Sequence, residues 1–262
     1  MRHQFSLPAV ALAALLTFPA CHVGSRSNNF HETVEKSVPL NADGRFRVEN
    51  INGTIRIDAW DRNEVQIVAE KSASSEAALA DIEIEIRGEG DRVDVQTRLP
   101  KSGWLLGGEG GSVSYEIIAP EGARITAITV NGQVRIEGIA GQVEAKSVNG
   151  KLEIIDAAGV VESSTVNGSV DVSYIALPDS GSHGITTVNG SVSLILPESA
   201  AGHFEVNTVN GGISSEFPLE ISQKKFGNFR SVSDSIGEGG GSFKIKTVNG
   251  QVQIRKRTSA EL

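Results

Sequence analysis

Asn-Gly pairs recur along this chain far more often than its composition explains. Half of the 14 asparagines precede a glycine, although 29 glycines in 262 residues would give about one or two such pairs by chance. Six of the seven pairs belong to the longer motif Ser/Thr-Val-Asn-Gly, and the residues that follow alternate polar and apolar, as in Gln133–Ile136. The chain therefore contains an internal repeat. Its Asn-Gly pairs begin at Asn52, Asn131, Asn149, Asn167, Asn189, Asn210 and Asn249.

This repeat predicts short strands that wind into stacked coils. Alternation with a period of two is typical of strands with one buried face, and Asn-Gly tolerates the positive φ angles of tight turns. From Asn131 onward the pairs lie 18, 18, 22, 21 and 39 residues apart, so one unit holds two strands and two turns. An antiparallel meander is the alternative, but it does not explain why the same sequence returns at every second turn.

In stacked coils, each repeat lies on the equivalent repeat of its neighbour. We therefore expect the seven asparagines to form a structural turn ladder and the valines to stack in the core. The crossover rule for parallel strands predicts a right-handed winding. The interval of 39 residues would hold two coils, with Gly227-Asn228 marking a degenerate one.

The expected fold class is all-β, a right-handed β-solenoid over residues 119–262 with an irregular N-terminal β cap over residues 30–118. The cap region also alternates, and Ser75–Asp81 is expected to form a short helix or crossover. Stacked coils need their terminal edges covered, which this region would do for the first coil. The Gly-rich segment around Trp104 is interpreted as a hairpin tip that packs on the cap or touches a partner.

The N-terminus has the pattern of an export signal. An apolar run from Leu7 to Phe18 is too short to span a bilayer, so residues 1–20 are read as a signal peptide. Cys21, the single cysteine, stands where a lipoprotein signal peptidase would leave it as the new N-terminus and the site of lipid attachment. Ordinary cleavage nearby is the alternative. Residues 21–29 would be a tether, and the protein an exported, membrane-anchored lipoprotein of the bacterial cell envelope, on its periplasmic or cell-surface side.

The charge balance argues against a nucleic-acid partner. The chain carries a formal charge of −8, whereas phosphate neutralisation needs a basic face. The one basic run, Arg255–Arg257, ends the last expected strand and is interpreted as a guard against edge-to-edge aggregation.

No constellation of catalytic or metal-ligating residues emerges from the sequence. There is no Gly-x-Ser-x-Gly elbow and no calcium-binding nonapeptide, and the scattered histidines, such as His183 and His203, are read as solvated loop positions. We expect no catalytic residue, no metal, no cofactor and no enzyme. The candidate binding surface is a strip of hydroxyl groups on neighbouring coils, although such residues also occupy solvated β surfaces or small coil corners; it comprises Thr165, Ser169, Thr187, Ser191 and Thr208.

The sequence also resembles a known family. The segments that carry the likeness are Asn52–Asp61, Tyr115–Gly122, the Val-Asn-Gly series, Ser215–Leu219 and Ile236–Gly239, which together cover nearly all of the mature chain. They resemble the bacterial "putative adhesin" proteins, the DUF4097-type β-strand repeat family. The resemblance implies a β-helical fold and a cell-envelope location.

We therefore expect a non-enzymatic, membrane-tethered β-solenoid that acts as an adhesin-like structural or interaction module. Its partners would be the membrane, through the lipid anchor, and a glycan or a protein. A glycan- or polysaccharide-binding module is the alternative, and a carbohydrate-active enzyme on a β-helix is a third reading.

Overall fold

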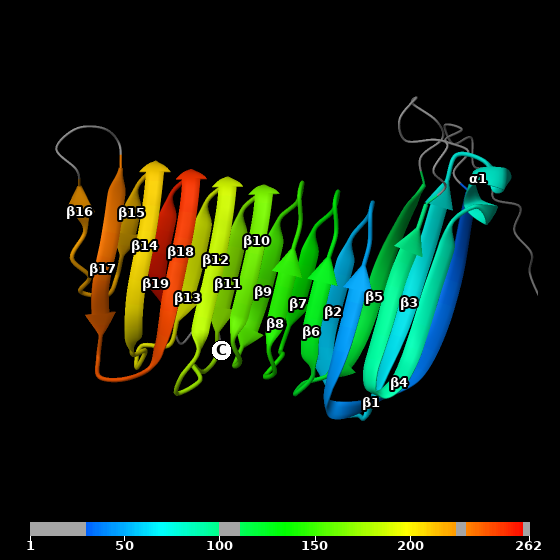
Figure 1. Ribbon diagram of the computed structural model, residues 1–262, viewed down its shortest axis with the longest axis horizontal. Coiled ribbons are helices and arrows are strands. Elements are labelled where there is room, and N and C mark those ends of the chain that lie inside the picture. Colours follow the sequence, from blue (N-terminus) through cyan, green and yellow to red (C-terminus); the bar gives the residue numbers. More distant parts are fainter. Residues whose placement is uncertain (1–29, 100–110, 224–228, 259–262) are drawn as a thin grey trace, which may run out of the picture.

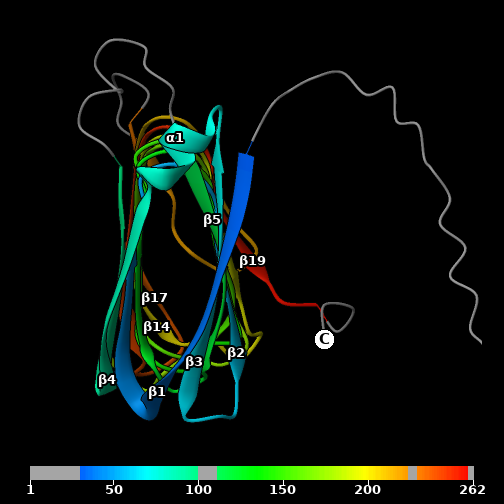
Figure 2. The same cartoon turned by 90° about the vertical axis from the view of Figure 1, so that its right-hand side faces the viewer.

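The computed structural model describes residues 30–99, 111–223 and 229–258, and this part of the chain is all-β. It holds strands β1 to β19 and the short helix α1 (Glu76–Ala80). The strands form two walls that face each other, with the hydrophobic core between them, and β1 belongs to both walls (Figures 1 and 2). Along the long axis, wall B contains β4 (Glu83–Arg98), β1 (Phe30–Glu49), β6 (Arg124–Ile128), β8 (Val143–Lys146), β10 (Val161–Asn167), β12 (Ser182–Asn189), β18 (Gly241–Asn249), β14 (Gly202–Asn210), β17 (Arg230–Ile236) and β16 (Ser222–Gln223).

Wall A begins with the first half of β1, which pairs antiparallel with β3. A coil crosses wall B in one strand, turns at Asn-Gly and returns along wall A in the next strand, as β8 and β9 do. In order, wall A contains β3 (Glu64–Ala73), β5 (Ser112–Pro120), β2 (Ile55–Trp60), β7 (Val134–Glu137), β9 (Leu152–Ala157), β11 (Val170–Tyr174), β13 (Val192–Leu196), β19 (Val252–Lys256) and β15 (Ile213–Ser215).

Successive repeats pair in parallel, so the solenoid-like stack, rather than the meander, describes the repeat region. In wall A, Val134 pairs with Leu152, and Leu152 pairs with Val170. Each of these side chains is fully buried, and a buried aliphatic side chain contributes about 1.5–3 kcal/mol. The inward row therefore stabilises the stack by placing aliphatic residues on aliphatic residues, and it continues through Val192, Val252 and Ile213.

The last coil does not lie at the end of the stack. β18 pairs with β12 on one side and with β14 on the other, so the C-terminal coil is inserted between two earlier ones (Figure 1, red between yellow strands). The expected degenerate coil between Asn210 and Asn249 is wrong, because β17, which follows the short strands β15 and β16, runs antiparallel to β14 as a return segment. Gly227 and Asn228 lie outside the described residues.

This insertion also changes the position expected for Arg255–Arg257. The strand that carries Arg255 is β19, which pairs with β13 on one side and with β15 on the other. The strand that carries Arg255 and Lys256 is therefore not the terminal strand of wall A, although the β15 pairing ends at Ile254 and leaves these two residues with a strand neighbour in β13 alone.

The N-terminal end of the stack is less regular, and α1 confirms the helix expected there. Ser75 caps α1 by accepting a hydrogen bond from the Ala78 backbone N–H at 3.2 Å. Strand β2 lies between β5 and β7, so the first Asn-Gly coil is part of the parallel stack. The boundary expected after residue 118 falls inside β5.

Candidate functional site

The seven repeat asparagines form one row along an edge of the stack. In six of them the side-chain Nδ2 donates to the Oδ1 of an adjacent asparagine at 2.8–2.9 Å, whereas Asn52 Nδ2 donates to the Gly111 carbonyl oxygen at 3.2 Å. The row follows the order of the coils in space, so that Asn249 lies between Asn189 and Asn210. The amide groups are therefore largely engaged with one another.

The glycines of the Asn-Gly pairs were expected to supply the positive φ angles of tight turns, but the structure requires them for another reason. Only Gly53 among them has a positive φ, of 113°. A Cβ atom at Gly150 would lie 1.8 Å from the carbonyl oxygen of Gly132 in the adjacent coil. Close approach between backbones, and not turn geometry, therefore excludes a side chain at this position.

The expected hydroxyl strip is wrong for its threonines. Thr165, Thr187 and Thr208 are buried, with exposures of 4%, 1% and 0%. Each Oγ1 donates to a glycine carbonyl of an adjacent coil, at 3.1, 2.9 and 3.0 Å respectively. Their hydroxyl groups satisfy backbone acceptors at the coil corner, while Ser169 is half-buried and Ser191 is exposed.

The valine of each repeat motif is also placed differently from the expectation. These side chains point outward beside the asparagine row and are about 40% exposed. The valines that stack in the core are instead those that follow the Asn-Gly pairs, such as Val134 and Val170. The motif valines form a narrow apolar ridge at Val130, Val148, Val166, Val188, Val209 and Val248.

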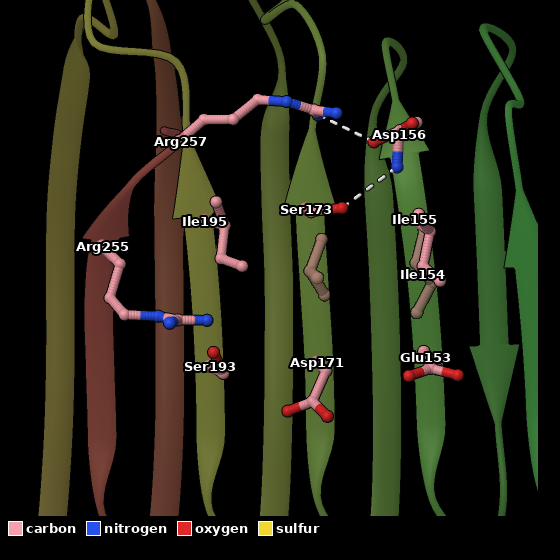
Figure 3. Close-up of a pocket in the computed structure, with 11 residues that line it drawn as sticks. Glu153, Ile154, Ile155, Asp156, Asp171, Ser173, Ser193, Ile195, Arg255 and Arg257 are labelled. Carbon is pink, nitrogen blue, oxygen red and sulfur yellow. Dashed lines mark hydrogen bonds and ion pairs between the residues drawn. The ribbon is translucent and has the colours of Figure 1, made fainter. Parts of the chain in front are cut away.

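One concavity on the outer face of wall A is a groove of about 390 Å³ across β9, β11, β13 and β19 (Figure 3). Ser173, Ile195 and Arg255 are register neighbours on three adjacent strands and line its centre. Ile155 and Ile195 are half-buried apolar side chains at its surface. We call this concavity the wall A groove.

A β-bulge in β9 shapes one end of the wall A groove. The register slips by one residue between β9 and β11, and Asp156 adopts a positive φ of 55°. Arg257 Nη1 donates to the Asp156 carboxylate at 2.7 Å and to the Tyr174 carbonyl oxygen at 3.2 Å, while Ser173 Oγ accepts from the Asp156 backbone N–H at 3.1 Å. The bulge thus joins residues 101 positions apart, and Arg257 stabilises the fold.

The acidic side of the wall A groove is neutralised by neighbouring cations. Lys151 Nζ lies 2.8 Å from Asp171 and 3.0 Å from Glu153, and Arg135 lies 2.7 Å from Glu153. Partial burial alone would raise the pKa of Glu153, but the hydrogen bonds from Lys151 and Arg135 outweigh it and hold this pKa below its ordinary value.

Arg255 is in the opposite situation. It is exposed, and among the described residues no carboxylate lies within ion-pair distance of its guanidinium, which extends across β13 above Ser193 (Figure 3). The wall A groove therefore offers a free cation, hydroxyl groups and two isoleucines, an arrangement that can bind but that contains no nucleophile paired with a base.

His183 corrects another expectation, because it lies in the core and not in a solvated loop. Its ring stacks on Phe243 with centroids 4.3 Å apart, and its Nδ1 lies 2.7 Å from the Tyr174 hydroxyl. Burial lowers the pKa of His183 to about 4, so the ring is neutral at pH 7. Within the described part of the chain, no group of three or more His, Cys, Asp or Glu side chains could hold a metal ion.

Comparison with the sequence models of known families identifies the family of this chain. The sequence model of the family described as "Toastrack DUF4097" matches residues 16–255. The chain belongs to the DUF4097 family. No curated protein matches this DUF4097 chain.

Solved structures similar to this DUF4097 chain include a "putative cell adhesion protein" from Clostridium sporogenes ATCC 15579, with 13% identity and a TM-score of 0.49, which covers 86% of this chain and 100% of that one. A "putative adhesin" from Bacteroides fragilis NCTC 9343 has 12% identity and a TM-score of 0.42, and covers 86% and 97%.

Two sequence features of this DUF4097 chain lie outside the described residues, namely Cys21 and the segment around Trp104. In the described residues, no helix is both long enough and apolar enough to cross a bilayer. The wall A groove was missed from the sequence because its residues come from four strands, β9, β11, β13 and β19, and only the spatial order of the coils unites them.

Proposed function

We propose that this protein is an exported, non-catalytic interaction module of the bacterial cell envelope that binds its partner in the wall A groove. The observation that carries the proposal is the unpaired guanidinium of Arg255 beside the half-buried side chains of Ile155 and Ile195. A free cation next to apolar surface favours a ligand with an anionic group and a short apolar or methyl-bearing body.

Tethering at Cys21 is part of the proposal. The signal-like residues 1–20 and the lone cysteine support a lipid anchor, and a rigid stack held on a membrane would display the groove to envelope partners. We also infer that the coils wind right-handedly and that the strands of residues 30–118 cap the stack. The adhesin-like role rests on the family resemblance.

A glycan ligand is the alternative to a protein ligand. Ser173 and Ser193 project from neighbouring strands into the wall A groove, together with the carboxylate of Asp171. Hydroxyl and carboxylate groups in a row are suited to hydrogen bonding with sugar hydroxyls. An acidic sugar would satisfy Arg255 as well.

Binding of the purified chain to a panel of immobilised envelope glycans and extracellular proteins tests the proposal. We expect saturable binding that falls at least tenfold in Arg255→Glu. The matched control is Lys246→Glu, which makes the same charge change on β18 in wall B. Equal binding by both variants and the wild type, or no saturable binding at all, would contradict the wall A groove as the contact surface.

A further inference from the structure

Three arginines stand in register on neighbouring strands of wall B. Arg45 of β1 pairs with Arg92 of β4 on one side and with Arg124 of β6 on the other. All three side chains are exposed on the outer face, and adjacent strands lie about 4.8 Å apart. Like charges directly opposite each other destabilise a sheet, so this row has an electrostatic cost in a chain that is acidic overall.

The row is only partly neutralised by the protein. Arg92 Nε donates to Asp94 at 2.6 Å, and its Nη2 donates to the same carboxylate at 3.0 Å. Within residues 30–99, 111–223 and 229–258, no carboxylate lies within ion-pair distance of Arg45 or Arg124. The acids nearest to them in sequence are Asp43, within β1, and Glu121, in the turn before β6.

A row on wall A provides an internal comparison. Arg56 and Arg135 are also in register on adjacent strands, with Glu116 beside Arg56 and Glu153 beside Arg135. There the charges are balanced by ion pairs, from Arg56 to Asp58 at 2.8 Å and from Arg135 to Glu153 at 2.7 Å. The protein thus neutralises one arginine row internally and leaves the other open.

The open row borders a concavity. Arg45, Arg92 and Arg124 line a cavity of about 320 Å³ together with Arg47, Ile125, Thr126, Gln142 and Glu144. The one carboxylate in this lining, Glu144, is engaged by Lys146 and accepts a hydrogen bond from Thr126 Oγ1 at 3.3 Å. Arg47 is engaged by the Glu49 carboxylate, so the unpaired guanidinium groups are those of Arg45 and Arg124. Guanidinium forks from adjacent strands can converge on one anion, and hydroxyl and amide groups beside them can complete its hydrogen bonds.

We propose that this cavity is a binding site for a tetrahedral oxyanion, a phosphoryl group, held over Arg45 with Arg124 and Arg92 on either side. A dianionic phosphate relieves the repulsion within the row, and its several oxygens match the number of donors. The site lies on the wall opposite the wall A groove, and it does not depend on the function proposed for that groove. A phosphorylated sugar and a phospholipid headgroup carry the same group and are the two sources to distinguish.

Calorimetric titration of the full-length purified chain with inorganic phosphate, a hexose phosphate and acetate tests the site. The test variant is Arg45→Gln/Arg124→Gln, and the matched control is Arg56→Gln/Arg135→Gln, which removes the same charge from wall A. We expect phosphate and the hexose phosphate to bind the wild type and the control saturably, and acetate to bind more weakly. In the test variant the affinity for phosphate should fall at least tenfold.

Co-sedimentation with vesicles of phosphatidylglycerol, compared with vesicles of phosphatidylcholine, separates the two sources of the phosphoryl group. Both variants keep the same N-terminus, so a difference between them in vesicle binding cannot come from that segment. Retention on phosphatidylglycerol that is lost only in the test variant would assign a lipid headgroup. Retention that is equal in both variants, together with specific hexose phosphate binding, would assign a sugar-borne phosphate.

Thermal unfolding at low ionic strength tests whether the test variant loses phosphate binding only because it is misfolded. Phosphate should raise the melting temperature of the wild type and of the control but not that of the test variant, whose own melting temperature without phosphate should equal or exceed that of the wild type. Phosphate binding that is the same in both variants, or that does not saturate in any of the proteins, would overturn the proposal.

Discussion

The strict repeats and the C-terminal end of the stack share the close contact between backbones but differ in the side chains packed inside wall B. Between β6 and β10, neighbouring backbones approach so closely that glycine is required, and inward side chains of wall B are small, such as Ala127 and Ala145. Toward the C-terminus the close backbone contact continues, because a Cβ at Gly250 would lie 1.8 Å from the Gly190 carbonyl oxygen. Three rings also stack there, with His183 and Phe204 on opposite sides of Phe243. Repetition therefore specifies contact between backbones throughout, and the inserted last coil adds side-chain packing to it.

The largest effect should come from breaking the backbone contact. Gly150→Val should destabilise the protein by about 3 kcal/mol or more, because its Cβ would collide with the Gly132 carbonyl oxygen of the adjacent coil. Gly239→Ala, at the C-terminal turn, meets no atom within 4 Å and should cost only about 1 to 2 kcal/mol, for its φ of 78°. Urea unfolding of both variants checks the contrast, and equal losses would contradict it.

The aromatic stack should make stability depend on pH. Burial lowers the pKa of His183 in the folded protein to about 4 from 6.5. The contribution of its neutral ring to the free energy of unfolding is therefore complete above pH 6.5 and is lost as the pH falls toward 4. The loss amounts to about 3 kcal/mol. His183→Phe keeps a ring between its neighbours and should remove this part of the acid dependence.

The measurement is urea unfolding of the wild type and His183→Phe at several pH values between 4 and 7.5. Carboxylates that titrate in the same range affect both proteins, so the difference between the two curves isolates His183. Parallel curves would show that the buried imidazole does not contribute.

The asparagine row should show a smaller, position-dependent effect. Asn149 donates to Asn131 and accepts from Asn167, whereas Asn210, at the end of the row, only donates to Asn249. Asn149→Ala should therefore cost about 1 to 2 kcal/mol, and Asn210→Ala about half of that. Thermal unfolding of the two variants measures the difference, and a larger loss at Asn210 would contradict a cooperative row.

The sequence by itself determined the local unit of this protein. The period of the Asn-Gly pairs, the alternation that follows them and the Ser75 cap are properties of residues close together in the chain, and propensity and periodicity act at that range. The family likeness likewise follows from the repeated motif, and residues 16–255 match the family model.

Only the tertiary structure decided which coils touch. The insertion of β18 between β12 and β14, the contact of Asp156 with Arg257 and the row formed by Arg45 with Arg124 all join residues that no local period relates. The sequence also did not determine whether the threonine or the valine of each motif faces the core. Both residue types suit either a buried or an exposed strand position. The physical reason is that stacking, and not the strand itself, determines the neighbours and the burial of each side chain.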